Sequence, residues 1–279
     1  MLYNVREYHR PTDLDEAIRL LQREDVRTAV LGGGVTLVGQ GRPDVEAVVD
    51  LDGLGLGTIE REGNALHLGA TVRIQTLVEE LGDVAGGLLS RAAYQVAGWN
   101  IRNAATLGGL LASGDVHSPL SVALAALGAQ VTVYDGTGYE THPWAELSTR
   151  IREEGLPGRI ITQIALELSA GIGSGYEQVG RTPADIPIVC AAAVAYPSND
   201  SQIKTRTAIG GLLHDLLVVE QSGPRDQPES ALEGLDQEIT AAHTPDTAYA
   251  DYRGSAEYRI GVAPVLARRA LSAAIDRLA

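Results

Sequence analysis

The amino-acid sequence predicts an α+β fold. Short segments that alternate apolar and polar residues occur in pairs typical of hairpins, and segments of helical period lie among them without a steady strand–helix alternation. The chain has 279 residues, 44% of them hydrophobic and 21% charged, which is ordinary for a globular protein and long enough for two domains. A stretch of small residues at Ser169–Gly173 separates two groups of predicted strands. We therefore expect one domain over residues 1–170 and a second over residues 171–279.

The first predicted domain opens with a strand at Val5–Tyr8. A helix begins at Thr12–Glu16, where capping-type side chains precede an apolar stripe. Two alternating segments on either side of Glu62-Gly63-Asn64 indicate a hairpin. The further elements are strands at Arg27–Leu31, Ala47–Leu51, Thr58–Arg61, Ala65–Gly69, Gln130–Tyr134 and Arg159–Leu168, and helices at Arg73–Leu81, Leu88–Ala97 and Leu120–Leu127.

The second predicted domain combines three strands with two helices. The strands are expected at Gly175–Val179, Ala191–Tyr196 and Thr205–Ile209. The polar stretch that follows indicates a single helix at Glu229–Ala242, and a long helix at Ala256–Leu278 closes the chain. Cys190 stands among small apolar residues, so we expect it in the core. Trp99 and Trp144 are expected to pack in the core or at an interface.

Composition excludes several classes of function. The 36 acidic residues against 22 basic ones give a net charge of −14, which argues against nucleic acid as a partner. One cysteine cannot form a disulfide framework, a thiolate zinc site or a thiolate-ligated iron–sulfur cluster within this chain. No stretch approaches the ~20 apolar residues that span a bilayer, and the N-terminus lacks a signal-peptide pattern. We therefore expect a soluble, cytoplasmic protein.

The sequence identifies no catalytic side chain and no set of metal ligands. The six histidines are scattered, without the paired spacing of a metalloprotease helix. A nucleophile elbow of the hydrolase type is absent as well. What remains as candidate chemistry is glycine-rich backbone.

The first glycine-rich loop is Gly32-Gly33-Gly34, directly after a predicted strand. It does not match a dinucleotide fingerprint, because Leu37 stands where the third glycine belongs, nor an ATPase phosphate loop, because Gln40 replaces the required lysine. Three glycines after a strand nevertheless let successive backbone N–H groups converge on an anion. A tight structural turn would explain the same residues.

A second glycine-rich loop, Thr106–Gly109, makes the first more informative. Each loop could hold one half of a pyrophosphate through its backbone amides. Ser113, Gly114 and Asp115 follow at a distance from which they could reach a ribose or a flavin ring. The alternative interpretation is a solvated loop without a ligand.

At these loops the sequence resembles a known family. Gly32–Leu37, followed by Val48–Leu51, resembles the first flavin loop of the FAD-binding medium subunits of molybdenum hydroxylases, the carbon monoxide dehydrogenase and xanthine dehydrogenase family. Asn100–Gly109 looks like the second flavin loop of that family. Further similar segments follow in the family's order, at Leu127–Val131, Arg181 with Asp185, Arg253–Arg259 and Arg268–Ala270.

The resemblance implies a fold and a function. It implies a PCMH-like FAD-binding domain of two α+β subdomains, followed by a smaller C-terminal α+β domain. It also implies an oxidoreductase subunit whose FAD takes electrons from iron–sulfur clusters on a small subunit, which a large molybdenum-cofactor subunit feeds, and passes them to an external acceptor. The single cysteine agrees with clusters on a partner. The expected assembly is a dimer of heterotrimers.

The resemblance also implies which residues contact FAD. They are Gly32, Gly33, Gly34, Val35, Thr36, Leu37, Thr106, Gly108, Gly109, Leu110, Ser113, Asp115, Ile161 and Gln178.

Some positions depart from the family pattern. Leu110 stands where the second loop usually continues with Asn, and Pro119 where an Asp usually contacts the flavin. Gln178 and Gly180 replace expected lysines. Each change removes a group that could contact the cofactor, and an Asn hydrogen bond alone is worth roughly 0.5–1.5 kcal/mol. A second hypothesis is therefore a subunit that keeps the fold but has weakened or lost its flavin and serves as an assembly scaffold. A third, a stand-alone flavin reductase or oxidase, is disfavoured by the C-terminal segments.

Overall fold

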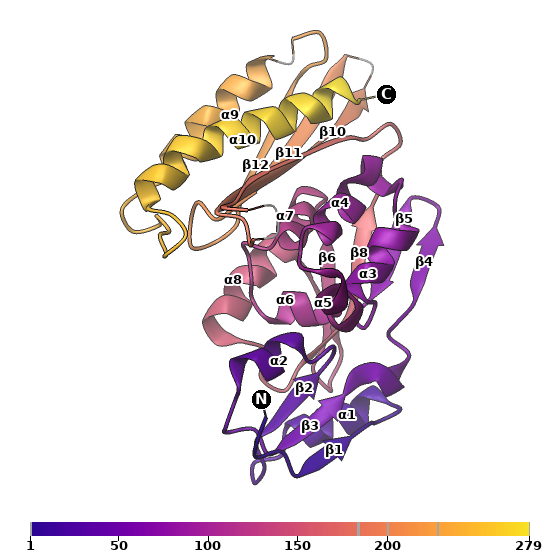
Figure 1. Ribbon diagram of the computed structural model, residues 1–279. Coiled ribbons are helices and arrows are strands. Elements are labelled where there is room, and N and C mark those ends of the chain that lie inside the picture. Colours follow the sequence, from indigo (N-terminus) through magenta and orange to yellow (C-terminus); the bar gives the residue numbers. More distant parts are fainter. Residues whose placement is uncertain (1, 183–184, 200, 228, 279) are drawn as a thin grey trace. The chain divides into compact units, whose positions relative to one another are not determined.

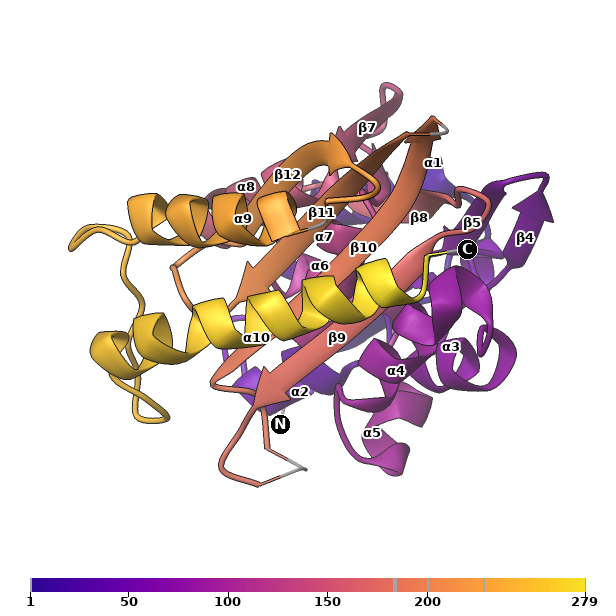
Figure 2. The ribbon, with the colours of Figure 1, turned by 90° about the horizontal axis from the view of Figure 1, so that it is seen from above.

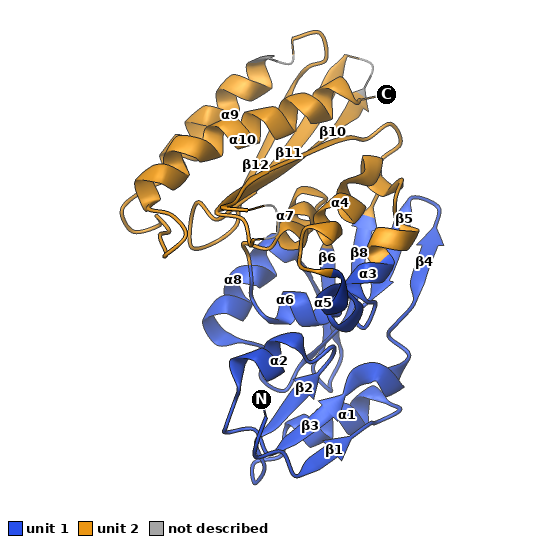
Figure 3. Ribbon diagram, viewed as in Figure 1, with its two compact units in different colours: residues 1–76, 99–115, 130–166 blue, residues 77–98, 116–129, 167–279 orange. Residues whose placement is uncertain are grey.

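A computed structural model describes residues 2–182, 185–199, 201–227 and 229–278. The chain forms two compact units (Figure 3). Unit 1 comprises residues 1–76, 99–115 and 130–166, and unit 2 comprises residues 77–98, 116–129 and 167–279. The chain thus passes between the units repeatedly, whereas we expected a single boundary at residue 170. Two helical segments placed in the first predicted domain, 77–98 and 116–129, group with the C-terminal part.

Unit 1 contains a small parallel sheet near the N-terminus. Its strand order is β1 (Glu7–His9), β3 (Ala47–Asp50), β2 (Thr28–Leu31), and both pairings are parallel. Helix α1 (Leu14–Leu21) connects the first two strands in the chain. It begins after Asp13, whose carboxylate accepts a hydrogen bond from the N–H of Glu16 at 2.8 Å. The helix therefore starts at the predicted capping segment.

Unit 1 also contains a five-stranded sheet, β4-β5-β8-β6-β7. The predicted hairpin is confirmed, because β4 and β5 pair antiparallel across Gly63. Helix α8 (Trp144–Glu154) follows β7 and buries Trp144, which is 1% exposed. The strands are β4 (Ile59–Glu62), β5 (Ala65–Gly69), β6 (Gln130–Tyr134), β7 (Tyr139–Pro143) and β8 (Ile160–Glu167).

Unit 2 is built on an antiparallel sheet in which consecutive strands are neighbours. The strands are β9 (Gly173–Val179), β10 (Val189–Asn199), β11 (Gln202–Gly210) and β12 (Leu217–Pro224). Helices α9 (Glu229–Ala242) and α10 (Ala256–Asp276) cover one face (Figure 2). Helix α10 approaches β9 closely, because a Cβ at Gly173 or Gly175 would overlap a carbonyl oxygen of the helix.

The other face of this sheet carries α4 (Leu88–Tyr94) and α7 (Pro119–Ala126) (Figure 1). Cys190 on β10 is fully buried, and its thiol donates to the His117 carbonyl oxygen at 3.7 Å. The expectation that Cys190 is a core residue is confirmed. All eight residues of α7 are buried, which explains why its sequence is apolar on every side.

Several elements were not predicted. Three helices of six residues each, α2 (Val35–Gln40), α5 (Trp99–Ala104) and α6 (Leu107–Ala112), lie within or beside the two glycine-rich loops. They are too short for a helical period to be visible in the sequence. Strand β12 was also missed, because it lies at the edge of its sheet and its sequence is half polar.

Two further observations concern the surface. Trp99 is 62% exposed and is therefore not a core residue, unlike Trp144. Among the described residues, no helix is both long enough and apolar enough to cross a membrane.

Candidate functional site

The two glycine-rich loops lie against each other in unit 1. A Cβ at Gly32 would stand 2.7 Å from the Thr106 hydroxyl oxygen and 4.0 Å from the Cα of Gly109. A Cβ at Gly109 would stand 2.7 Å from the same hydroxyl. Loops about seventy residues apart in the chain are thus in contact through glycines, as the pyrophosphate hypothesis requires.

Gly33 makes the closest approach. A Cβ there would overlap the Ala104 carbonyl oxygen and lie 2.9 Å from the Cα of Ala105. Any other residue would push the first loop away from the second. Gly34 has a different requirement, since its φ is +73°, in the left-handed region that favours glycine. Close approach therefore explains the first two glycines and backbone conformation explains the third.

The first loop presents backbone donors without acceptors. The first intrahelical bond of α2 runs from the N–H of Val38 to the Gly34 oxygen at 2.9 Å, so the N–H groups of Val35, Thr36 and Leu37 have no partner in the helix. Within the described part of the chain, no carbonyl or side chain accepts from the N–H groups of Gly33 to Leu37. A run of open N–H groups beside two close-packed glycines fits an anion such as a phosphate.

The second loop uses its donors internally. The N–H of Gly108 donates to the Ala70 oxygen at 2.8 Å, and the N–H of Leu107 to the Val72 oxygen at 2.9 Å. The N–H of Gly109 donates to the Thr106 hydroxyl at 3.2 Å, which caps α6. A Cβ at Gly108 would lie 2.7 Å from the Cβ of Ala70. The second loop is consequently a rigid surface against which the first loop packs. The N–H groups of Leu107, Gly108 and Gly109 are already used within the chain.

Arg73 adds a positive charge beside the contact between the loops. Its Nη1 donates to the Ala104 carbonyl oxygen, the same oxygen that a Cβ at Gly33 would overlap. Its Nη2 lies 4.0 Å from the Asp52 carboxylate, and the side chain is 37% exposed. Arg73 therefore fixes the carbonyl that faces Gly33 while its charge remains accessible. Sequence reasoning missed it, because nothing in the local pattern indicates this position.

The remaining candidate residues of unit 1 differ in burial and in their hydrogen bonds. Leu110 is half-buried in α6, and the exposed Ser113 uses its hydroxyl to donate to the Leu110 oxygen at 2.6 Å. Asp115 is partly buried just after this helix. Ile161 on β8 is 4% exposed and precedes Thr162, whose carbonyl accepts from the N–H of Ala70.

Gln178 and Pro119 belong to unit 2. The Gln178 side chain accepts a hydrogen bond from the Tyr176 hydroxyl at 2.6 Å and donates to Gln95 at 3.3 Å. Pro119 is buried as the first residue of α7, where proline costs no hydrogen bond. Both side chains thus have a structural role within their own unit.

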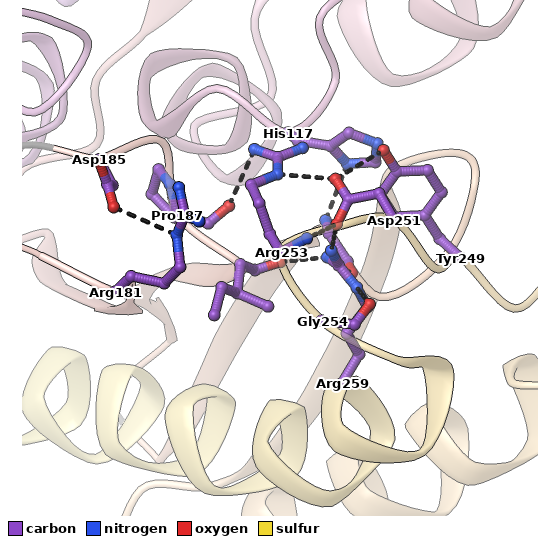
Figure 4. A network of polar contacts seen from close by, with 11 residues as sticks. His117, Arg181, Asp185, Pro187, Tyr249, Asp251, Arg253, Gly254 and Arg259 are labelled. Atoms are coloured by element: carbon purple, nitrogen blue, oxygen red, sulfur yellow. Dashed lines mark hydrogen bonds and ion pairs between the residues drawn. The ribbon is translucent and has the colours of Figure 1, made fainter.

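The C-terminal segment Arg253–Arg259 forms a polar network in unit 2 (Figure 4). The fully buried Arg259 donates to the carbonyl oxygens of Gly211 at 2.7 Å and Gly254 at 3.1 Å, and pairs with Asp251. Burial acts to raise the pKa of Asp251, but hydrogen bonds from Arg253 and the charge of Arg259 outweigh it and hold that pKa at about 2. This network ties the start of α10 to the sheet.

Aromatic rings complete the same network. The Arg259 guanidinium lies 4.7 Å from the centroid of the Tyr249 ring, on which the His117 imidazole stacks at 4.4 Å. The N–H of Gly211 donates to Nδ1 of His117 at 2.9 Å. Arg181 pairs with Asp185 at 3.3 Å. Arg259, Tyr249, His117 and Gly211 thus link four segments of unit 2, whereas the Arg181–Asp185 pair is a local contact. Among the residues that the structure describes, no acidic, histidine and cysteine side chains gather as a metal site.

Comparison with known proteins decides the family. Residues 3–166 match the family model of the FAD binding domain in molybdopterin dehydrogenase. The chain belongs to this family. The matched FAD-binding domain contains both glycine-rich loops, and the open N–H groups and the close approach at Gly33 fit the pyrophosphate of its cofactor. The predicted family and FAD as the cofactor are confirmed.

Similarity extends beyond the matched domain. The chain is 28% identical to the carbon monoxide dehydrogenase medium chain of Afipia carboxidovorans, over 97% of each chain. It is also 28% identical to the nicotine 6-hydroxylase medium subunit of Paenarthrobacter nicotinovorans, over 95% of each. The structure of carbon monoxide dehydrogenase from Hydrogenophaga pseudoflava matches with a TM-score of 0.83 and 25% identity over the whole of both chains. These matches confirm the α+β fold and an oxidoreductase subunit.

Proposed function

We propose that this chain is the flavoprotein medium subunit of a molybdenum hydroxylase. In this role it passes electrons from the iron–sulfur clusters of a small subunit, fed by a large molybdenum-cofactor subunit, through FAD to an external acceptor. Likeness along the whole chain to two medium subunits of such enzymes supports the proposal. The only cysteine, Cys190, is buried in the core of unit 2, so the clusters come from a partner.

The observation that carries the proposal is the contact between the two glycine-rich loops. Gly32 and Gly33 bring the first loop against Thr106 and Ala104, and the N–H groups of Gly33 to Leu37 stay open. These groups donate to the FAD pyrophosphate, and Arg73 adds charge complementarity. FAD, when bound, supplies the change between two-electron and one-electron transfer.

We propose as FAD contacts all the residues that the resemblance implies. The first loop contributes the phosphate donors, the second loop contributes a wall of glycines and a capping threonine, and the residues after α6, on β8 and on β9 contribute the remaining contacts. They are Gly32, Gly33, Gly34, Val35, Thr36, Leu37, Thr106, Gly108, Gly109, Leu110, Ser113, Asp115, Ile161 and Gln178.

Specific observations favour a second candidate function, an assembly scaffold with weakened flavin binding. Leu110 offers no polar group at the second loop, and Pro119 is buried as the start of a helix. The N–H groups of Gly108 and Gly109 already have partners within the chain. In this alternative the loops keep their packing but bind FAD too weakly for turnover.

The absorbance spectrum of the purified chain, before and after FAD is added, separates the two candidates. The electron-transfer role predicts flavin bands that saturate with FAD, and no iron–sulfur absorbance from this chain alone. No binding at high micromolar FAD would instead support the scaffold.

The partner proposal has its own test. We propose a dimer of heterotrimers in the cytoplasm, so affinity purification from the native cells should recover a small cysteine-rich chain and a large chain at fixed stoichiometry. Recovery as a free monomer at every salt concentration would contradict the subunit role.

A further inference from the structure

Two arginine side chains of unit 2 converge on one buried serine. Arg91 in the last turn of α4 donates from Nη2 to the Ser174 hydroxyl at 3.3 Å. Arg277, directly after α10, donates from Nη1 to the Ser174 carbonyl oxygen at 2.8 Å. Ser174 lies on β9 and is fully buried. The two guanidinium groups therefore come close together at the end of the sheet.

Neither guanidinium group has a carboxylate partner among the described residues, and both donate to the neutral Ser174. The pKa of Arg91 is lowered, by burial first and then by the charge of Arg277. The carbonyl ends of α4 and α10 offset only about half a charge per helix. In a chain with a net charge of −14, this pair is an uncompensated positive site.

A pocket of about 270 Å³ adjoins Arg91. Tyr94 lines this pocket, and its side chain is 58% exposed. Hydrogen bonds from Tyr176 to Gln178 and from Gln178 to Gln95 fix the polar part of the lining. Convergent polar groups next to aromatic surface are typical of small-molecule sites. The lining residues are Val78, Ser90, Arg91, Tyr94, Gln95 and Tyr176.

We propose that Arg91 and Arg277 bind the phosphate group of a small aromatic phosphate monoester whose ring lies against Tyr94 in the adjoining pocket. Guanidinium forks match phosphate oxygens in geometry and charge. The volume of about 270 Å³ leaves room for one aromatic ring next to Arg91. All of these residues belong to unit 2 and none lies in the glycine-rich loops. Among the proposed flavin contacts, Gln178 adjoins the pocket through its hydrogen bonds with Tyr176 and Gln95.

Calorimetric titration of the full chain, saturated with FAD, tests this site. The probes are inorganic phosphate and phenyl phosphate at constant ionic strength. Two charge-assisted contacts predict a Kd of about 0.1–1 mM for inorganic phosphate. Phenyl phosphate should bind roughly tenfold more tightly through the Tyr94 ring. Tyr94→Ala should abolish that difference and leave the affinity for inorganic phosphate unchanged.

Matched arginine variants test whether binding depends on Arg91 and Arg277 in particular. Arg91→Gln and Arg277→Gln should each weaken phenyl phosphate at least about tenfold. Arg269→Gln removes the same charge from an exposed position of α10 and should bind as the wild type. If Arg91→Gln does not fold by circular dichroism, Arg91→Lys keeps the charge without the fork and should still lose affinity.

Three results would overturn the proposal. They are no saturable binding up to about 10 mM of either probe, equal affinity for the two probes, and a loss in Arg269→Gln as large as in Arg91→Gln. The same titrations without FAD separate these results from a failure of flavin binding, because the arginine variants are expected to change the affinity for the phosphate probes alone.

Discussion

The two glycine-rich loops look alike in sequence but differ in how their backbone is used. In the loop at Gly32–Gly34 and the turn that follows, the N–H groups are open, and the glycines serve close approach and a left-handed conformation. In the loop at Thr106–Gly109 the N–H groups are bound to Ala70, Val72 and the Thr106 hydroxyl. Glycine therefore accompanies open backbone donors in one loop and a packing surface in the other, and only the hydrogen-bond partners distinguish them.

The largest expected effect follows from Gly33→Ala. The added Cβ overlaps the Ala104 carbonyl oxygen and must separate the loops, so FAD affinity should fall by more than about a hundredfold. Fluorescence quenching on FAD titration measures the loss. Gly39→Ala in the adjacent helix is the matched control, since a Cβ there meets nothing within 4 Å. Wild-type affinity in Gly33→Ala would contradict the close-approach account.

The next effect tests the open donors of the first loop. Val35→Pro removes one N–H at the first position of α2, and because the ψ of Gly34 is −8°, the proline ring also crowds the backbone of that residue. Loss of one hydrogen bond to a charged phosphate costs about 1.5–3 kcal/mol, or about ten- to hundredfold in affinity. Val35→Ala keeps the N–H and serves as the control. Equal affinity in both variants would show that this donor does not contact FAD.

For the second loop the expected change lies in stability. Thr106→Ala removes the cap of α6 and should lower the melting temperature of the FAD-free chain by about 2–4 °C, equivalent to ~1 kcal/mol. The affinity for FAD should change by less than about threefold once the chain is folded. A reverse result, with affinity lost and stability kept, would make the second loop the donor site.

How much the sequence could predict differs between these features. The glycine positions, the predicted hairpin and the long helix α10 follow from local patterns, and the structure has them. Whether a given N–H has an acceptor depends on residues far away in the chain, such as Ala70 for the N–H of Gly108. A local sequence pattern carries no information about such a partner. For the same reason the sequence did not indicate Arg73, because its position beside the loops depends on contacts with Asp52 and Ala104. Segment 116–129 groups with unit 2 because α7 contacts β10 and β11.

The smallest effect concerns the departure at Leu110. This side chain is half-buried at the end of the second loop, and Leu110→Asn would restore a polar group there. One added hydrogen bond of ~1 kcal/mol should tighten FAD binding by up to about fivefold. The same titration measures it. Weaker binding in Leu110→Asn would identify leucine as an adapted contact.

Amide hydrogen exchange, followed by NMR with and without FAD, tests the contrast between the loops most directly. The account predicts that the N–H groups of Gly33 to Leu37 exchange fast in the free chain and become protected when FAD binds. The N–H groups of Gly108 and Gly109 should be protected already without FAD. Protection by FAD that is confined to Gly108 and Gly109, with unchanged exchange at Gly33 to Leu37, would contradict it.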